Sequence, residues 1–128
     1  MEYYFSKTIN CSFDNAVQKV TEALKTEGFG ILTEIDIKAT LKTKLDVDFY
    51  NYKILGACNP PYAYKALLIE DKIGTMLPCN VIVQEKVPGK VVVSAVDPAA
   101  SMLSIENDEL REIATDIRVK LQYVIDQL

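Results

Sequence analysis

Residues 77–96, LPCNVIVQEKVPGKVVVSAV, contain the clearest β-hairpin signal in the chain. Two valine-rich runs, residues 77–87 and 90–96, flank the dipeptide Pro88-Gly89. Branched side chains favour extended backbone, and a turn dipeptide between two such runs is typical of a hairpin. Asp97-Pro98 then reads as a turn signal that ends the second run. The sequence therefore predicts two antiparallel strands here.

Outside the hairpin, the pattern alternates strands with helices that are apolar along one stripe only. We expect strands over residues 3–9, 29–37 and 52–58, helices over 13–27, 38–45 and 60–70, and a long helix from about residue 107 to 128. Helices of this kind must cover one face of a sheet. The predicted fold class is therefore α+β, a two-layer domain with a mainly antiparallel sheet and helices on one face. Residues 1–128 are expected to form this single domain.

The hairpin is apolar on both of its sides. The residues that make it so are Val81, Ile82, Val83, Val92 and Val96. We therefore expect a second copy of the chain to cover the open face or an edge of the sheet, which would make the protein a homodimer.

Composition excludes several function classes. The 128 residues are 49% hydrophobic and carry a net charge of −4. Surfaces that bind nucleic acid or anionic membranes need clustered lysine and arginine, so we expect neither partner. The chain contains no histidine, which removes Ser-His-Asp and Cys-His dyads and the common zinc hydrolase ligand sets.

The N-terminal residues lack the basic start and the apolar stretch of a signal peptide. A cytoplasmic location is the expectation. Cys11, Cys58 and Cys79 would then be reduced thiols.

Two short segments each place a cysteine directly before an asparagine, with proline nearby. They are residues 56–61, GACNPP, and residues 77–81, LPCNV. Cys58 would lie at a helix N-terminus, where the unpaired backbone N–H groups favour a thiolate nucleophile. It could equally be a small buried hydrophobic residue, and Cys79 has the same two interpretations.

If the two cysteines lie close together, three uses are open. They could form a redox-active pair, supply soft ligands to a zinc or copper ion, or line a small-molecule pocket. Met76 and Met102 could add thioether ligands but are more typical of core packing. The chain has no Cys-X-X-Cys spacing, which weakens the redox interpretation.

Polar residues near these segments complete the candidate site. Asn59 is expected to cap the helix that follows it, whereas Asn80, at the start of a valine-rich strand, has no such explanation. Asp97 could place a carboxylate at a strand end in the same region. Glu34 and Asp36 would share one face of the second strand.

Several of these segments, taken in order, resemble the domain of unknown function 302 family. They are GFGILTEID at 28–36, ATLK at 39–42, ILGACNP at 54–60, LPCNV at 77–81 and Asp97-Pro98. The resemblance covers essentially the whole chain and implies a small α+β domain that tends to form dimers. It assigns no biochemical activity. It supports as candidate ligand-binding residues Cys58, Asn59, Cys79, Asn80, Glu34 and Asp97.

The leading functional hypothesis is a cytoplasmic homodimeric module that binds a small ligand or a soft metal ion, zinc or copper, between the two Cys-Asn segments. Cys58 and Cys79 would be the metal ligands. One alternative is a thiol-dependent enzyme with Cys58 as nucleophile. Another is a structural dimerisation domain whose cysteines are inert.

Overall fold

A five-stranded antiparallel sheet forms one layer of the protein, as seen in a computed structural model that describes residues 2–128. Its strands are β1 (Tyr4–Asn10), β2 (Gly30–Asp36), β3 (Asn51–Cys58), β4 (Cys79–Val87) and β5 (Lys90–Val96), in the spatial order β1-β5-β4-β3-β2. The predicted hairpin is confirmed as β4 and β5. The strand β4 is the central strand of the sheet, and β5 lies next to it. Gly89 turns the hairpin with a φ of 80°, a conformation that side chains with a Cβ rarely adopt.

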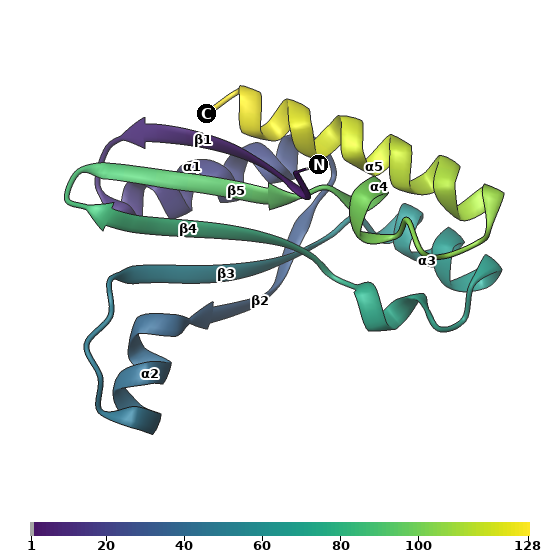
Figure 1. Cartoon of the computed structure of the whole chain (residues 1–128). Helices are drawn as coiled ribbons and strands as arrows, with labels where there is room; N and C mark the ends of the chain where they lie inside the picture. The colour runs from purple at the N-terminus through teal and green to yellow at the C-terminus, as the bar shows by residue number, and fades with distance from the viewer. Residues whose placement is uncertain (1) are drawn as a thin grey trace.

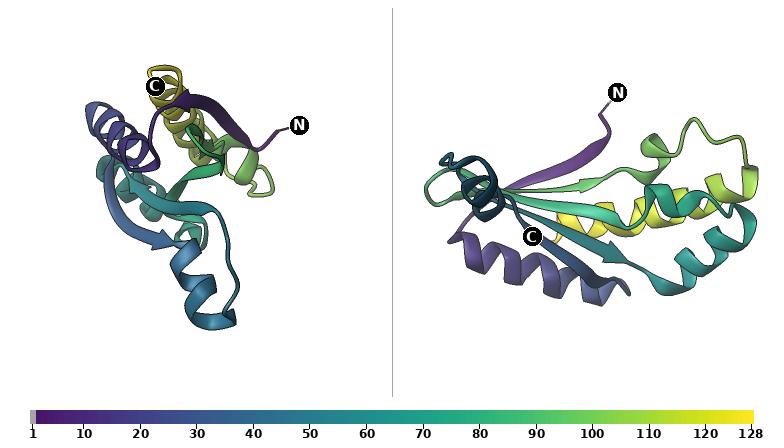
Figure 2. Two further views of the ribbon diagram at one scale, coloured as in Figure 1. Left: turned by 90° about the vertical axis from the view of Figure 1, so that its left-hand side faces the viewer. Right: turned by 90° about the horizontal axis from the view of Figure 1, so that it is seen from below.

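Two long helices cover one face of this sheet, which confirms the predicted α+β class (Figures 1 and 2). They are α1 (Phe13–Thr26) and α5 (Asp108–Asp126). In α1, Ser12 Oγ accepts a hydrogen bond from Asn15 N and caps the helix, as its position predicts. The buried stripe Phe13, Ala16, Val20 and Leu24 then packs on the sheet.

The other helices lie at the edges of this two-layer core. The helix α2 (Ile37–Leu45) projects from the body beside β2 and has no buried residue (Figure 1). The helix α3 (Pro60–Ile69) and the 3-10 helix η1 (Ile73–Met76) connect β3 to β4 at the opposite end. A short helix, α4 (Pro98–Ser101), follows β5. The sequence analysis did not expect η1 or α4.

The central strands show the alternation that the hairpin sequence predicts. Val81 and Val83 are fully buried beneath the helices, whereas Ile82 and Val92 are half-buried on the opposite face. That face holds a shallow groove of about 590 Å³, and Ser6 and Ser94 share a hydrogen bond of 2.6 Å between their Oγ atoms within it. The homodimer expected to cover this face stays a prediction.

No helix within residues 2–128 combines the length and hydrophobicity that crossing a bilayer requires.

Candidate functional site

The two Cys-Asn segments lie side by side where the chain leaves the sheet and returns to it. The antiparallel register pairs Ala57 with Cys79 and Gly56 with Asn80. Between these strand ends the chain forms an excursion, residues 60–76, that contains α3 and η1. Residues 56–59 and 77–80 are therefore the neck of this excursion.

The neck is tightly packed around Gly56. A Cβ atom on this residue would collide with Oγ1 of Thr33 and would lie 2.7 Å from Cγ of Pro78. Glycine is needed here because of this close approach. The chain after β3 and the chain before β4 are thus held together at the neck.

A cavity of about 360 Å³ lies between the excursion and the body of the protein. Its walls come from both Cys-Asn segments, the excursion, the β2 region, α4 and α5. The lining side chains are almost all apolar, and none within residues 2–128 is charged. The lining residues are Phe29, Leu32, Ala57, Cys58, Asn59, Tyr62, Ala63, Ala66, Leu67, Gly74, Leu77, Pro78, Cys79, Met102, Leu110, Ile113, Ala114 and Ile117.

Both thiols line this cavity, but their environments differ. Cys79 is 5% exposed and packs in the main core, whereas Cys58 is half-buried. Burial, with a smaller contribution from the neighbouring Cys58, raises the pKa of the Cys79 thiol to about 11. Cys79 is therefore a protonated, weakly nucleophilic thiol at neutral pH.

The two cysteines are one residue out of register, because the ladder pairs Ala57, not Cys58, with Cys79. Both nevertheless line the same cavity, and Cys58 lies near enough to contribute to the raised pKa of Cys79. Both are free thiols in the structure, and the redox interpretation gains no support from it.

Asn59 lines the cavity but does not cap α3 with its side chain as the sequence analysis expected. Its Nδ2 instead donates to the carbonyl oxygen of Glu27 at 3.1 Å. The bond joins the neck to the turn between α1 and β2. A local capping pattern could not reveal this because Glu27 is remote in sequence.

Asn80 lies on the opposite face of the sheet and lines the shallow groove there. Strand alternation explains the separation, since Asn80 follows the core-facing Cys79 directly. Of the two Cys-Asn segments, both cysteines and Asn59 line the cavity, whereas Asn80 does not.

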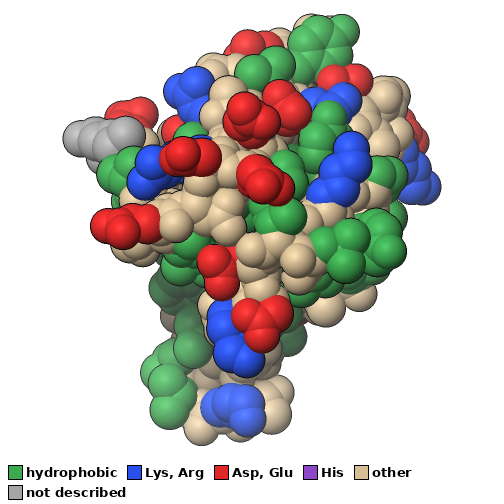
Figure 3. Space-filling view, turned by 90° about the vertical axis from the view of Figure 1, so that its right-hand side faces the viewer, with side chains coloured by type: hydrophobic (Ala, Val, Ile, Leu, Met, Phe, Trp, Pro, Cys, Tyr) green, Lys and Arg blue, Asp and Glu red, His purple; other side chains and the backbone are tan. Residues whose placement is uncertain are grey.

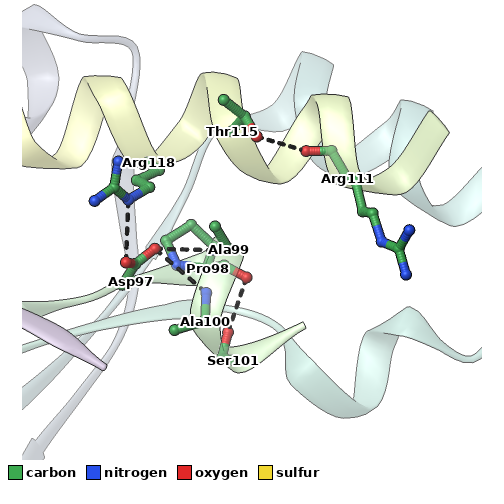
Figure 4. A network of polar contacts seen from close by, with 8 residues as sticks. All are labelled: Asp97, Pro98, Ala99, Ala100, Ser101, Arg111, Thr115 and Arg118. Atoms are coloured by element: carbon green, nitrogen blue, oxygen red, sulfur yellow. Dashed lines mark hydrogen bonds and ion pairs between the residues drawn. The ribbon is translucent and has the colours of Figure 1, made fainter. Parts of the chain in front are cut away.

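The two candidate carboxylates have structural partners away from the cavity. Glu34 forms an ion pair with Lys53 at 2.8 Å, and the hydrogen bond to Glu34 raises the pKa of the lysine. Asp97 is buried, caps α4 through Ala99 N at 3.0 Å and pairs with Arg118 Nε at 3.0 Å (Figure 4). Neither residue lines the cavity with the two cysteines.

Asp36, which the sequence analysis placed on the same face of the second strand as Glu34, has a structural role as well. Its Oδ1 accepts a hydrogen bond from Ala39 N at 2.9 Å and so caps α2.

A metal ion would need further ligands beside Cys58 and Cys79. Within the part of the chain that the structure describes, no group of three or more His, Cys, Asp or Glu residues is placed to hold one. Met102 adds a third sulfur to the cavity wall. The expected zinc or copper site therefore gains no support from the described residues.

The family model described as domain of unknown function DUF302 matches residues 5–128. The chain belongs to the DUF302 family. Its fold is similar to the crystal structure of an uncharacterised conserved DUF302 protein from Bacillus stearothermophilus. The two chains are 26% identical, the match covers 99% of this chain and 98% of that one, and the TM-score is 0.91. No curated protein matches the chain in sequence.

Sequence reasoning missed the half of the cavity that α3 and α5 contribute. Ala63 and Ala66 lie one turn apart on α3, and Ala114 lies on α5. Small side chains at facing helix positions leave space between two helices. That spacing is the one signal in the sequence that could have indicated these walls.

Proposed function

We propose that this DUF302 domain binds a small, uncharged and mainly apolar molecule in the cavity beneath the excursion. The supporting observation is the cavity itself, with a volume of about 360 Å³ and an almost entirely apolar lining. Volumes of roughly 300–1,000 Å³ and predominantly hydrophobic walls are typical of small-molecule sites.

The lining also limits the ligand's charge. A buried charged group without a partner is strongly unfavourable, and the described lining residues offer no ionised group to pair with it. Ligand polarity would have to be confined to one or two neutral groups near Asn59, whose Nδ2 donates one of its two N–H groups to the carbonyl oxygen of Glu27. Binding therefore depends on apolar contact area.

The proposal is tested by filling the cavity. Ala114 is 2% exposed and lines the cavity, so Ala114→Leu would place three more carbon atoms within it. The probe is N-phenyl-1-naphthylamine, an uncharged aromatic molecule whose fluorescence rises in apolar surroundings. We expect wild-type protein to bind the probe and Ala114→Leu to bind it at least tenfold more weakly.

The matched control is Ala39→Leu, the same substitution at an exposed position of α2. It should leave the dissociation constant of the probe unchanged. Equal affinity of the wild type and Ala114→Leu would locate the probe elsewhere and contradict the proposal.

A further inference from the structure

The apolar interior of the protein is divided into two clusters. The main cluster fills the space between the sheet, α1 and the C-terminal half of α5. A second, small cluster joins the excursion to α4 and the N-terminal half of α5, and its members are Ala66, Ile73, Met102, Leu110 and Ala114. The cavity has walls from both clusters. Ile113 packs against both of them, and Tyr62 of the excursion packs against the main one.

Few polar contacts hold the excursion to the body. Apart from the bonds within its helices, one backbone N–H of the excursion donates outside it, from Ala63 N to Asn59 O in the neck at 3.0 Å, and the others, such as Ile73 N to Glu70 O at 3.1 Å, end within the excursion. Asn107 Nδ2 donates to Ile69 O at 3.1 Å and is a contact across to α5. Among the described residues, no ion pair joins the excursion to the rest of the chain.

The outer surface of the excursion adds little to its attachment. Leu68 is 67% exposed and Tyr64 is 65% exposed, so much of its apolar surface faces solvent. The space-filling view of this end shows hydrophobic side chains open to solvent among acidic and basic ones (Figure 3). Segments with few buried contacts are those that open at low free energy.

The neck, by contrast, is firmly held. Thr33 and Pro78 close around Gly56, and the pair Ala57 and Cys79 still belongs to the β-ladder. Any movement of the excursion would therefore end at the neck, where Asn59 and Leu77 lie outside regular structure.

From these observations we propose that the excursion is a lid, which swings on the neck as one unit and admits ligand to the cavity while the sheet stays folded. The purpose of the lid rests on the proposed function, but its motion does not. Asn59 and Leu77, the residues of the neck outside regular structure, are then the hinge residues, and the contacts of the small cluster hold the lid closed.

Native-state hydrogen exchange tests the motion with two matched variants. Ile73 in the small cluster and Ile125 in the main cluster are each 1% exposed. If the lid opens separately, the contacts of Ile125 persist in the open state. Ile125→Val should then accelerate exchange of the β4 and β5 amides, by about twofold to tenfold for a lost buried methyl group, and leave α3 amides unchanged.

The second variant gives the complementary result. The contacts of Ile73 are lost both when the lid opens and when the whole protein unfolds, so Ile73→Val should accelerate the amides of α3 and of the sheet alike. If Ile125→Val changes sheet exchange by less than twofold, Val93→Ala replaces it in the same comparison. Equal acceleration of α3 and sheet amides by the main-cluster variant would mean that the protein opens as one unit, and it would overturn the proposal.

Ligand entry is tested separately by stopped-flow binding of N-phenyl-1-naphthylamine. Ile73→Val should raise the association rate constant by the factor by which it accelerates α3 exchange, and Ile125→Val should leave it unchanged. A probe that does not bind would refute the proposed function. The hydrogen-exchange pattern would still show whether the excursion opens separately from the sheet. A probe that binds at equal rates in all three proteins would refute entry through the lid.

Discussion

Replacing Gly56 by alanine should destabilise the protein, because the neck has no room for the added methyl group. The added methyl would collide with Thr33 Oγ1 and lie 2.7 Å from Pro78 Cγ. Thr33 is exposed and can rotate, but the proline ring is part of the backbone that enters β4. Overpacking of this kind costs about 1–3 kcal/mol. The entropy that alanine removes from the unfolded chain offsets about 0.4–1 kcal/mol of it.

The expected net loss is therefore about 1–2 kcal/mol of unfolding free energy. With an unfolding entropy of about 2.1 cal/mol/K per residue over 128 residues, this lowers the Tm by about 4–7 °C. Thermal unfolding followed by circular dichroism measures the shift. Adding Thr33→Ala to Gly56→Ala removes one of the two collisions and should restore part of the loss.

The control is the same substitution at Gly30, in the neighbouring strand β2. A Cβ there would meet no atom within 4 Å, so Gly30→Ala should leave the Tm unchanged or raise it slightly. If Gly56→Ala is as stable as Gly30→Ala, the neck is not closely packed and the reasoning is refuted.

Three further predictions address charge and association. Because the pKa of Cys79 is raised to about 11 in the folded state, stability should fall as the pH rises from about 9 to 11, and urea titrations of Cys79→Ala should lack that part of the fall. Asp97→Ala removes the α4 cap and the partner of Arg118, so it should lower the free energy of unfolding in urea by about 1–3 kcal/mol. The control Asp116→Ala, at an exposed position, should cost less. Equal losses in the two variants would show that Asp97 has no structural role. If a second copy covers the open face of the sheet, light scattering should report a dimer that Ile82→Lys converts to a monomer, and a wild-type monomer would contradict this.

The hairpin shows why so much of the fold could be predicted from sequence. Its signals are local: branched residues favour extended backbone, Pro88-Gly89 favours a turn, and alternation assigns each valine a face. The same holds for α1, where the Ser12 cap and the buried stripe lie within one short segment. Such features need no knowledge of distant residues.

The helix α4 was missed although its signals were present. Asp97 is followed by Pro98 and two alanines, which is a cap, a proline suited to the first helical position and two strong helix formers. The interpretation as a turn used only the first two residues.

The cavity could not be derived in the same way because its walls belong to segments far apart in the chain. Ala66 on α3 and Ala114 on α5 face one space only after the sheet and both helices are placed. The acceptor for Asn59 depends on the same assembly, since Glu27 is brought to the neck by the turn before β2. Tertiary contacts of this kind override local capping preferences.

From the repeated Cys-Asn pattern, a single shared site was expected, because two similar segments were taken to occupy equivalent positions in the fold. In an antiparallel pair, two like segments meet in opposite directions, and their register decides which residues share a face. Here Ala57, not Cys58, pairs with Cys79, so the pattern is one residue out of register. The two asparagines have different surroundings: Asn59 donates to Glu27 beside the cavity, and Asn80 lines the open face of the sheet. The repeated motif thus explains how two strand ends are held together at the neck, while ligand binding must be argued from the apolar walls around them.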